Sequence, residues 1–95
     1  MLLVQTEEKA QGWRALATMT NGAEALLFVG RSSKQIREEY IAAFQELLDD
    51  DEQESVTAIQ LQQWQGSPDS GRWLTKGELR NPAKVRAGSL MAKAA

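Results

Sequence analysis

The residues with the most versatile binding chemistry in this chain are tryptophans and cations in its carboxyl-terminal third. Trp64 and Trp73 flank a turn, and Arg72 directly precedes the second indole. Indoles beside cations on an open sheet can stack on single-stranded nucleic acid, and the same residue types supply much of the affinity at protein interfaces. Because the chain has a formal net charge of −2 and no recognisable RNA-binding motif, we favour a protein contact.

The strand before these indoles is expected to present a ladder of amide side chains. From Ser55 to Gln65 the sequence alternates, with Ile59 and Leu61 on one side and glutamines on the other. The apolar side should pack against a helix, so the glutamine side should face outward. If the strands around the following loop pair as a hairpin, Trp64 opposes Trp73. We therefore predict a binding surface made of Gln60, Gln62, Trp64, Arg72 and Trp73.

A second candidate site is the start of the one long helix. Hydroxyl groups and cations around the unpaired N–H groups of a helix N-terminus can bind an anion or a phosphate group. The spacing is not that of a P-loop, so a capped helix start with solvated basic side chains is the interpretation we favour. The residues of this possible anion site are Arg31, Ser32, Ser33, Lys34 and Arg37.

An acidic run follows the same helix, from Asp49 to Glu54. Clustered carboxylates can hold calcium, but an EF-hand loop needs a central glycine that this run lacks. We therefore predict a solvated loop and no metal site. The alternative use of the run is to dock a basic partner, and the cationic tail of the chain is one candidate.

Few side chains in this sequence are suited to catalysis. There is no histidine and no cysteine, so the commonest general base and the thiol nucleophile are both missing. Tyr40 lies on the predicted core side of the helix, where a packed ring is the expected role. We predict no catalytic residue, no cofactor and no enzymatic activity.

Composition is that of an ordinary globular domain, but charge is unevenly distributed. The 95 residues are 42% hydrophobic and 25% charged. Residues 1–65 carry five Lys and Arg against eleven Asp and Glu, whereas residues 66–95 carry six against two, which gives net charges of −6 and +4. Without cysteine, and with only a short apolar run at the start, the chain is expected to be cytoplasmic and not bound to a membrane.

The helix that organises the fold is predicted over residues 33–48. Its apolar side chains recur at helical spacing and form one core-facing stripe. Ser32 can cap the helix, with Gln35 completing a capping box. The stripe consists of Ile36, Tyr40, Ala43, Phe44 and Leu47.

A β-hairpin is predicted before this helix. Asn21 and Gly22 separate two apolar runs, a pattern typical of a two-residue type I′ turn in which both turn residues have positive φ. Counting back from such a turn pairs Leu16 with Leu27 and Arg14 with Val29.

These elements predict an α+β fold, a small β-β-α-β-β sandwich with one long helix packed on one face of a three- or four-stranded sheet. We expect residues 1–80 to form a single domain and residues 81–95 to form a basic, small-residue-rich tail that is either a short helix or disordered. The sheet is expected to be antiparallel or mixed, and the strand after the helix would run parallel to the strand before it if it joins the same sheet in βαβ fashion.

One helix covers one sheet face, and the other face is left for contact. The sequence therefore predicts a non-enzymatic interaction module that binds a protein partner, or a second copy as a homodimer, through the uncovered face. The alternative is a nucleic-acid-binding protein that uses Trp64, Trp73 and the basic carboxyl-terminal segment.

Overall fold

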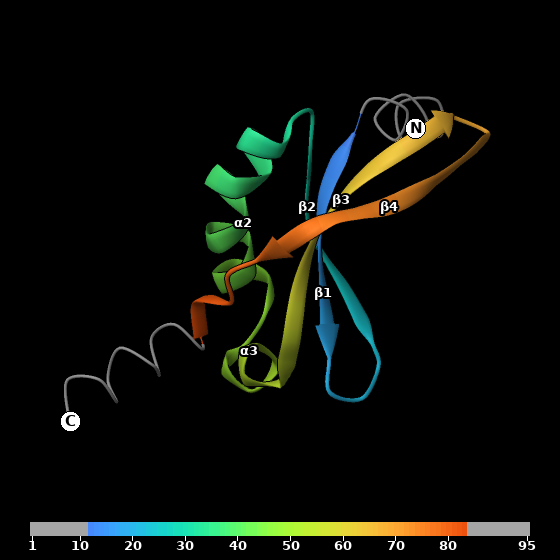
Figure 1. Cartoon of the computed structure of the whole chain (residues 1–95). Helices are drawn as coiled ribbons and strands as arrows, with labels where there is room; N and C mark the ends of the chain where they lie inside the picture. The colour runs from blue at the N-terminus through green and yellow to red at the C-terminus, as the bar shows by residue number, and fades with distance from the viewer. Residues whose placement is uncertain (1–11, 84–95) are drawn as a thin grey trace.

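The computed structural model describes residues 12–83, which form a four-stranded antiparallel sheet and two helices. The strand order is β2-β1-β3-β4, and α2 lies on one side of the sheet (Figure 1). The predicted β-β-α-β-β order and α+β class are confirmed. Residues 84–95 of the predicted tail lie outside the described residues. The elements are β1 (Trp13–Met19), β2 (Glu24–Gly30), α2 (Ser33–Leu47), α3 (Asp50–Ser55), β3 (Val56–Ser67) and β4 (Ser70–Leu79).

The connection through α2 makes a split β-α-β unit. Both β2 and β3 pair antiparallel with β1, so they run parallel to each other with β1 between them. The predicted direction of the third strand is confirmed, although its neighbour is β1. Because β3 lies at the centre of the sheet, its side chains can contact those of both β1 and β4.

The turn between β1 and β2 differs from the predicted two-residue turn. The Gly22 N–H donates to the Met19 carbonyl oxygen, and the Met19 N–H donates to the Ala23 carbonyl oxygen. Gly22 has a φ of +85°, whereas Asn21 does not have a positive φ. The loop therefore has three residues, with the glycine in the left-handed conformation after a tight turn. The Asn21 carboxamide oxygen accepts from the Ala23 N–H and fixes this conformation.

A β-bulge in β2 decides which side chains enter the core. Arg14 pairs with Val29 as predicted, but the register shifts after Ala15 and pairs Leu16 with Leu26 instead of Leu27. The extra residue is Leu27, which is 4% exposed and belongs to the core, while Leu26 is 50% exposed. Leu26 and Leu27 lie on opposite sides of the sheet, as neighbours in a strand do, and the bulge leaves both Leu27 and Phe28 on the core side.

The core lies between α2 and the sheet. Ile36, Tyr40 and Phe44 are buried as the stripe predicted, and Ala43 is half-buried. The prediction for Leu47 is wrong: it is 59% exposed, and Leu48 takes its place at 6%. The sheet contributes Ala15, Ala17, Leu27, Val56, Ile59, Leu61 and Leu79.

The acidic run forms a helix and not the predicted loop. Asp49 caps α3, its side chain accepting from the Glu52 N–H while the Glu52 carboxylate accepts from the Asp49 N–H. Asp50, Asp51 and Glu52 lie in the first turn of α3, where negative charges are favourable because this end of a helix is positive. The same carboxylates are unfavourable beside the negative carboxyl-terminal end of α2. The buried Gln53 side chain donates to the Leu48 carbonyl oxygen and joins the two helices.

Candidate binding surface

The sheet face turned away from α2 is called the open face. Directly opposed residues in adjacent strands lie on the same face, so the register identifies its members. Leu16 pairs with Leu26 and Gln60, and Arg14 pairs with Gln62. The open face comprises Arg14, Leu16, Thr18, Glu24, Leu26, Val29, Ala58, Gln60, Gln62, Trp64, Trp73, Thr75 and Glu78.

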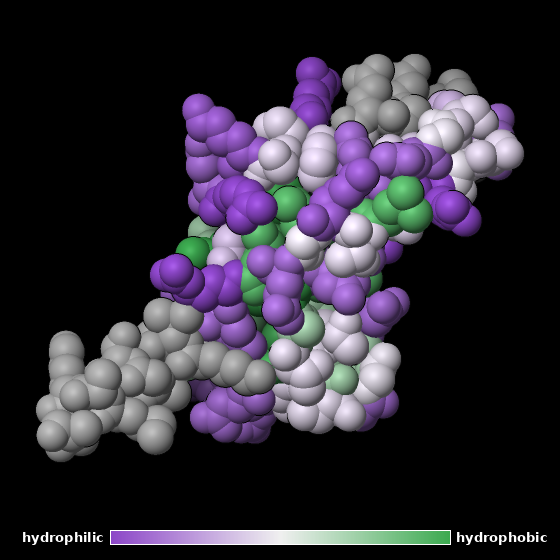
Figure 2. Space-filling view, in the orientation of Figure 1, coloured by the Kyte–Doolittle hydropathy of each residue, from purple (hydrophilic) through white to green (hydrophobic). Residues whose placement is uncertain are grey.

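The β3–β4 hairpin projects beyond the part of the sheet that α2 covers (Figure 1). The visible surface is mostly polar, and apolar side chains gather where α2 meets the sheet and again on this hairpin (Figure 2). The hairpin carries both indoles of the predicted surface. These indoles therefore sit on an arm that no helix of the described chain covers.

Trp64 and Trp73 form the predicted cross-strand pair. Their ring centroids are 5.4 Å apart, with an edge-to-face angle of 74° between the ring planes. The Trp64 indole N–H donates to the Ser67 carbonyl oxygen at 3.1 Å. The indole also lies close to the backbone of Gly71, where an added Cβ would come within 2.7 Å of the indole nitrogen. The arm thus fixes the position of Trp64 through backbone contacts as well as through the second ring.

Arg14, which the predicted surface did not include, connects the indole pair with the amide ladder. Its guanidinium carbon lies 4.3 Å from the ring centroid of Trp73, at cation–π distance. Its Nε donates to the Gln62 carboxamide oxygen at 2.7 Å. Desolvation lowers the pKa of Arg14 from its ordinary value, and Glu24 acts in the opposite direction. The guanidinium remains charged at any physiological pH.

The amide ladder is a closed hydrogen-bond network. Gln62 is only 8% exposed, and its amide nitrogen donates to Gln60 Oε1 at 3.0 Å and to Thr75 Oγ1 at 3.2 Å. The Thr75 hydroxyl donates to Gln60 Oε1 at 3.3 Å. Because the Gln62 nitrogen faces these two acceptors, its oxygen must face Arg14. The network therefore sets the position of the arginine side chain.

Four of the five predicted surface residues share the open face, namely Gln60, Gln62, Trp64 and Trp73. Arg72 pairs with Gln65 and is exposed on the opposite side of the projecting hairpin. Arg14 and Thr75 belong to the same cluster because both are paired with Gln62, from β1 and from β4. The alternation within each strand could have placed them on a face, but no pattern in the sequence shows that β1 lies beside β3.

The predicted anion site is a capped helix start. Ser32 Oγ accepts from the Gln35 N–H at 3.1 Å, and Gln35 Oε1 accepts from the Arg31 N–H at 2.8 Å. The return bond of the predicted capping box thus reaches Arg31 instead of Ser32. Lys34 lies 3.9 Å from Glu38, and both side chains are exposed. Ser33 is half-buried and Arg37 is exposed. Anion binding here stays a prediction.

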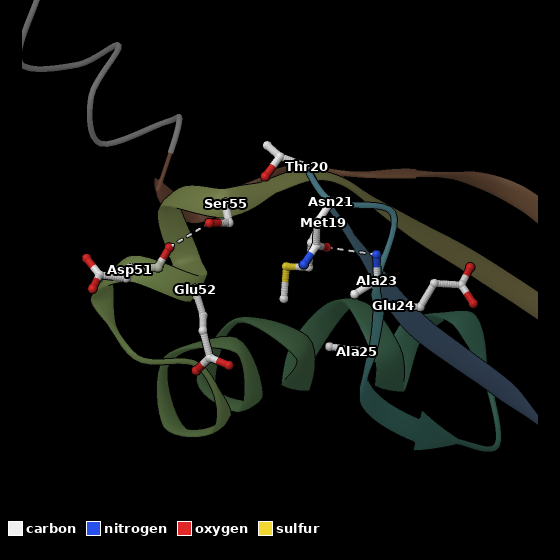
Figure 3. Close-up of a pocket in the computed structure, with 9 residues that line it drawn as sticks. All are labelled: Met19, Thr20, Asn21, Ala23, Glu24, Ala25, Asp51, Glu52 and Ser55. Atoms are coloured by element: carbon white, nitrogen blue, oxygen red, sulfur yellow. Dashed lines mark hydrogen bonds between the residues drawn. The ribbon is translucent and has the colours of Figure 1, made fainter.

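A cavity of about 330 Å³ lies between the β1–β2 turn and α3 (Figure 3). Met19 and Ala25 contribute apolar side chains, and Glu24, Asp51 and Glu52 contribute carboxylates. The carboxylates of Asp51 and Glu24 point away from each other (Figure 3). Within residues 12–83, no group of three metal-ligating side chains could hold a metal ion. The cavity therefore offers no converging set of ligands.

Comparison with known proteins finds no match: no family model, no curated protein and no solved structure corresponds to this chain. Between residues 12 and 83, neither helix is long and apolar enough to cross a membrane.

Proposed function

We propose that this protein is a non-enzymatic interaction module that binds a protein partner, or a second copy of itself, through the open face. The observation that carries the proposal is the cluster of Trp64, Trp73 and Arg14 beside the buried amide of Gln62. Tryptophan and arginine dominate the energetics of protein interfaces. Held in one arrangement by mutual contacts, they lose little side-chain entropy when a partner binds.

The exposed leucine of the open face supports the same function. Leu26 is one of three large hydrophobic residues in the described chain with high exposure, and it lies on the edge strand β2. Together with the indole arm, it gives the open face apolar contacts at two separated places. A partner that spans the face would bury both.

Nucleic acid is the second candidate, through Trp64, Trp73 and the basic carboxyl-terminal segment. Stacking a base requires an accessible ring surface and a run of cations along the groove. The guanidinium of Arg14 already lies over the ring of Trp73. Glu24 and Glu78 share the open face, on which Arg14 is the one cation that the register places. These features favour a protein partner.

The test is a paired affinity capture from the source cell, with the oligomeric mass of each purified protein measured by light scattering. The wild type is compared with a Trp64→Ala, Trp73→Ala variant and with an Ile41→Ala control, whose side chain is exposed on α2. We expect a defined partner, or a dimer, with the wild type and the control but not with the double variant. Identical partners and identical masses for all three proteins would contradict the proposal.

A separate measurement addresses the nucleic-acid candidate. Fluorescence anisotropy with an oligothymidylate at low salt should show no saturable binding. The variant to compare is Lys76→Gln, Arg80→Gln, which removes two exposed cations while keeping Leu79 in the core. Binding that falls steeply with salt and is weakened in this variant would transfer the function to nucleic acid.

A further inference from the structure

The guanidinium of Arg14 is held in place, but most of its hydrogen-bonding capacity is unused. An arginine side chain has five N–H donors, of which four are on the two terminal nitrogens. The Nε donor is bonded to Gln62, and the guanidinium carbon lies over the ring of Trp73. Within residues 12–83, the terminal nitrogens of Arg14 donate no hydrogen bond and form no ion pair.

The surroundings of Arg14 restrict how its fork can point. Gln62 is fixed by Gln60 and Thr75, so the acceptor for Nε cannot turn away without breaking two other hydrogen bonds. Trp73 is fixed in turn by its edge-to-face contact with Trp64. When Nε is bonded to Gln62, the edge formed by the two terminal nitrogens lies on the side of the guanidinium opposite Nε. The Arg14 side chain has therefore already lost rotamer freedom in the folded protein, and ordering it costs less when a ligand binds.

A fixed planar fork of N–H donors matches one chemical group best. Carboxylates accept two parallel hydrogen bonds from arginine, and this bidentate pairing is stronger and more specific than a single bond. The guanidinium is weakly hydrated compared with an ammonium group, so a partly buried position favours arginine over lysine in this role. Glu24, the open-face carboxylate whose charge acts on Arg14, forms no ion pair with it.

We propose that Arg14 binds the carboxylate of an acidic side chain on the protein partner of the open face. This inference rests on the function proposed above and names the chemistry that its partner must present. A phosphate of a nucleic acid could also pair with one guanidinium. A polyanion, however, draws its affinity from several cations in a row, and Arg14 is flanked on the open face by amides, a hydroxyl and leucine.

The test uses the full chain and a short capped peptide with a single glutamate, followed by ¹H–¹⁵N NMR. We expect saturable shifts of the Arg14 Nε–H signal and of the Trp73 indole N–H signal. The same peptide with glutamine in place of glutamate should bind at least roughly tenfold more weakly, because a charge-assisted bidentate pair is lost. Arg72, an exposed arginine on the opposite side of the hairpin, is the internal control and should not shift.

A variant adds a second measurement. Arg14→Lys keeps the positive charge but removes the planar fork, so we expect at least about fivefold weaker binding of the glutamate peptide. The peptide titration of the wild-type protein tests the proposal even if the Arg14→Lys variant does not fold. Equal shifts with the glutamine peptide, equal shifts at Arg72, or no shift at Arg14 would each overturn the proposal. Tighter binding of an oligothymidylate at the same signals would also overturn it, in favour of phosphate.

The failure of this inference is distinguishable from the failure of the proposed function. If the Trp64→Ala, Trp73→Ala variant loses a partner while Arg14 ignores the glutamate peptide, the open face binds protein by other contacts. If Arg14 binds the peptide but the double variant keeps every partner and its mass, the carboxylate site exists without the proposed interface.

Discussion

The hydroxyl of Tyr40 donates a hydrogen bond of 2.7 Å to the carbonyl oxygen of Arg80. The bond joins the middle of α2 to the residue that follows β4, forty positions further along the chain. Neighbouring contacts strengthen this junction, since the Asn81 side chain donates to the Val56 carbonyl oxygen and accepts from the Ala83 N–H. The tyrosine therefore does more than fill the core: it holds the end of the sheet against the helix.

Replacing Tyr40 by phenylalanine tests this junction. The ring should remain packed, and the Arg80 carbonyl should lose its donor, at a cost of about 1 kcal/mol in the free energy of unfolding. Urea denaturation followed by circular dichroism would measure the change. The matched control is Tyr40→Leu, which also removes the ring and should cost more, about 2–4 kcal/mol. Equal stability of the phenylalanine variant and the wild type would show that the bond contributes nothing.

Tyr40 also predicts an alkaline limit to stability. Burial raises the pKa of Tyr40 above its ordinary value of 10.0, against smaller opposing effects of Arg80 and Arg37. Because the folded chain holds the proton more tightly than the unfolded chain, the contribution is complete below about pH 10 and is lost as the pH rises through the folded pKa. Urea midpoints measured from pH 8 to 11 should fall at the alkaline end. The fall should be smaller in Tyr40→Phe, and an identical pH dependence in both proteins would contradict this assignment.

The elements were predictable because each has a local cause. The apolar period of α2 and the alternation in β3 are visible in the sequence, and they fix which sides of the helix and strand enter the core. The bulge at Leu27 was not predictable in this way. Both Leu26 and Leu27 suit a strand, and the choice between them depends on the three-residue loop that Gly22 allows.

The binding cluster was predictable only in part, for a related reason. Trp64 and Trp73 lie on consecutive strands, so a hairpin argument pairs them. Arg14 reaches Gln62 across forty-eight positions, and that contact exists only because β3 inserts beside β1. Strand order depends on the packing of the whole sheet, and no local spacing encodes it.

Leu47 and Leu48, at the end of α2, differ in how much each should contribute to stability. The period places Leu47 in the core, but α2 ends there, and Leu48 adopts an extended backbone that turns its side chain inward. Leu48→Ala should cost about 2–4 kcal/mol through the cavity it leaves, whereas Leu47→Ala should change stability by less than about 0.5 kcal/mol. Thermal and urea unfolding of both variants would measure the two changes in the free energy of unfolding. The reverse order of costs would mean that the helix continues through Leu48.

The cap of α3 should be worth a measurable amount as well. Asp49→Ala removes the side-chain acceptor for the Glu52 N–H and leaves the return bond without a matching cap, which should cost about 1 kcal/mol. Asp50→Ala is the control, because this exposed residue lies in the same turn with no capping bond. Native-state hydrogen exchange should show faster exchange of the Glu52 and Gln53 amides in the first variant. Equal exchange rates in both variants would show that the Asp49 side chain does not stabilise the start of α3.

The arm that carries the indoles depends on a glycine. A Cβ at Gly71 would lie 2.5 Å from the Gln65 carbonyl oxygen and 2.7 Å from the Trp64 indole nitrogen, so Gly71→Ala must displace the ring or the partner strand. At Gly77, further along the same strand, an added Cβ meets nothing within 4 Å. We expect Gly71→Ala to cost about 1–3 kcal/mol in the free energy of unfolding and to change the near-ultraviolet circular dichroism of the coupled indoles. Gly77→Ala should be close to neutral.

The same two variants also test the proposed function. A partner that requires the present arrangement of Trp64 and Trp73 should bind the Gly77→Ala protein normally and the Gly71→Ala protein weakly. Normal binding by a folded Gly71→Ala protein would mean that the geometry of the indole pair does not determine recognition.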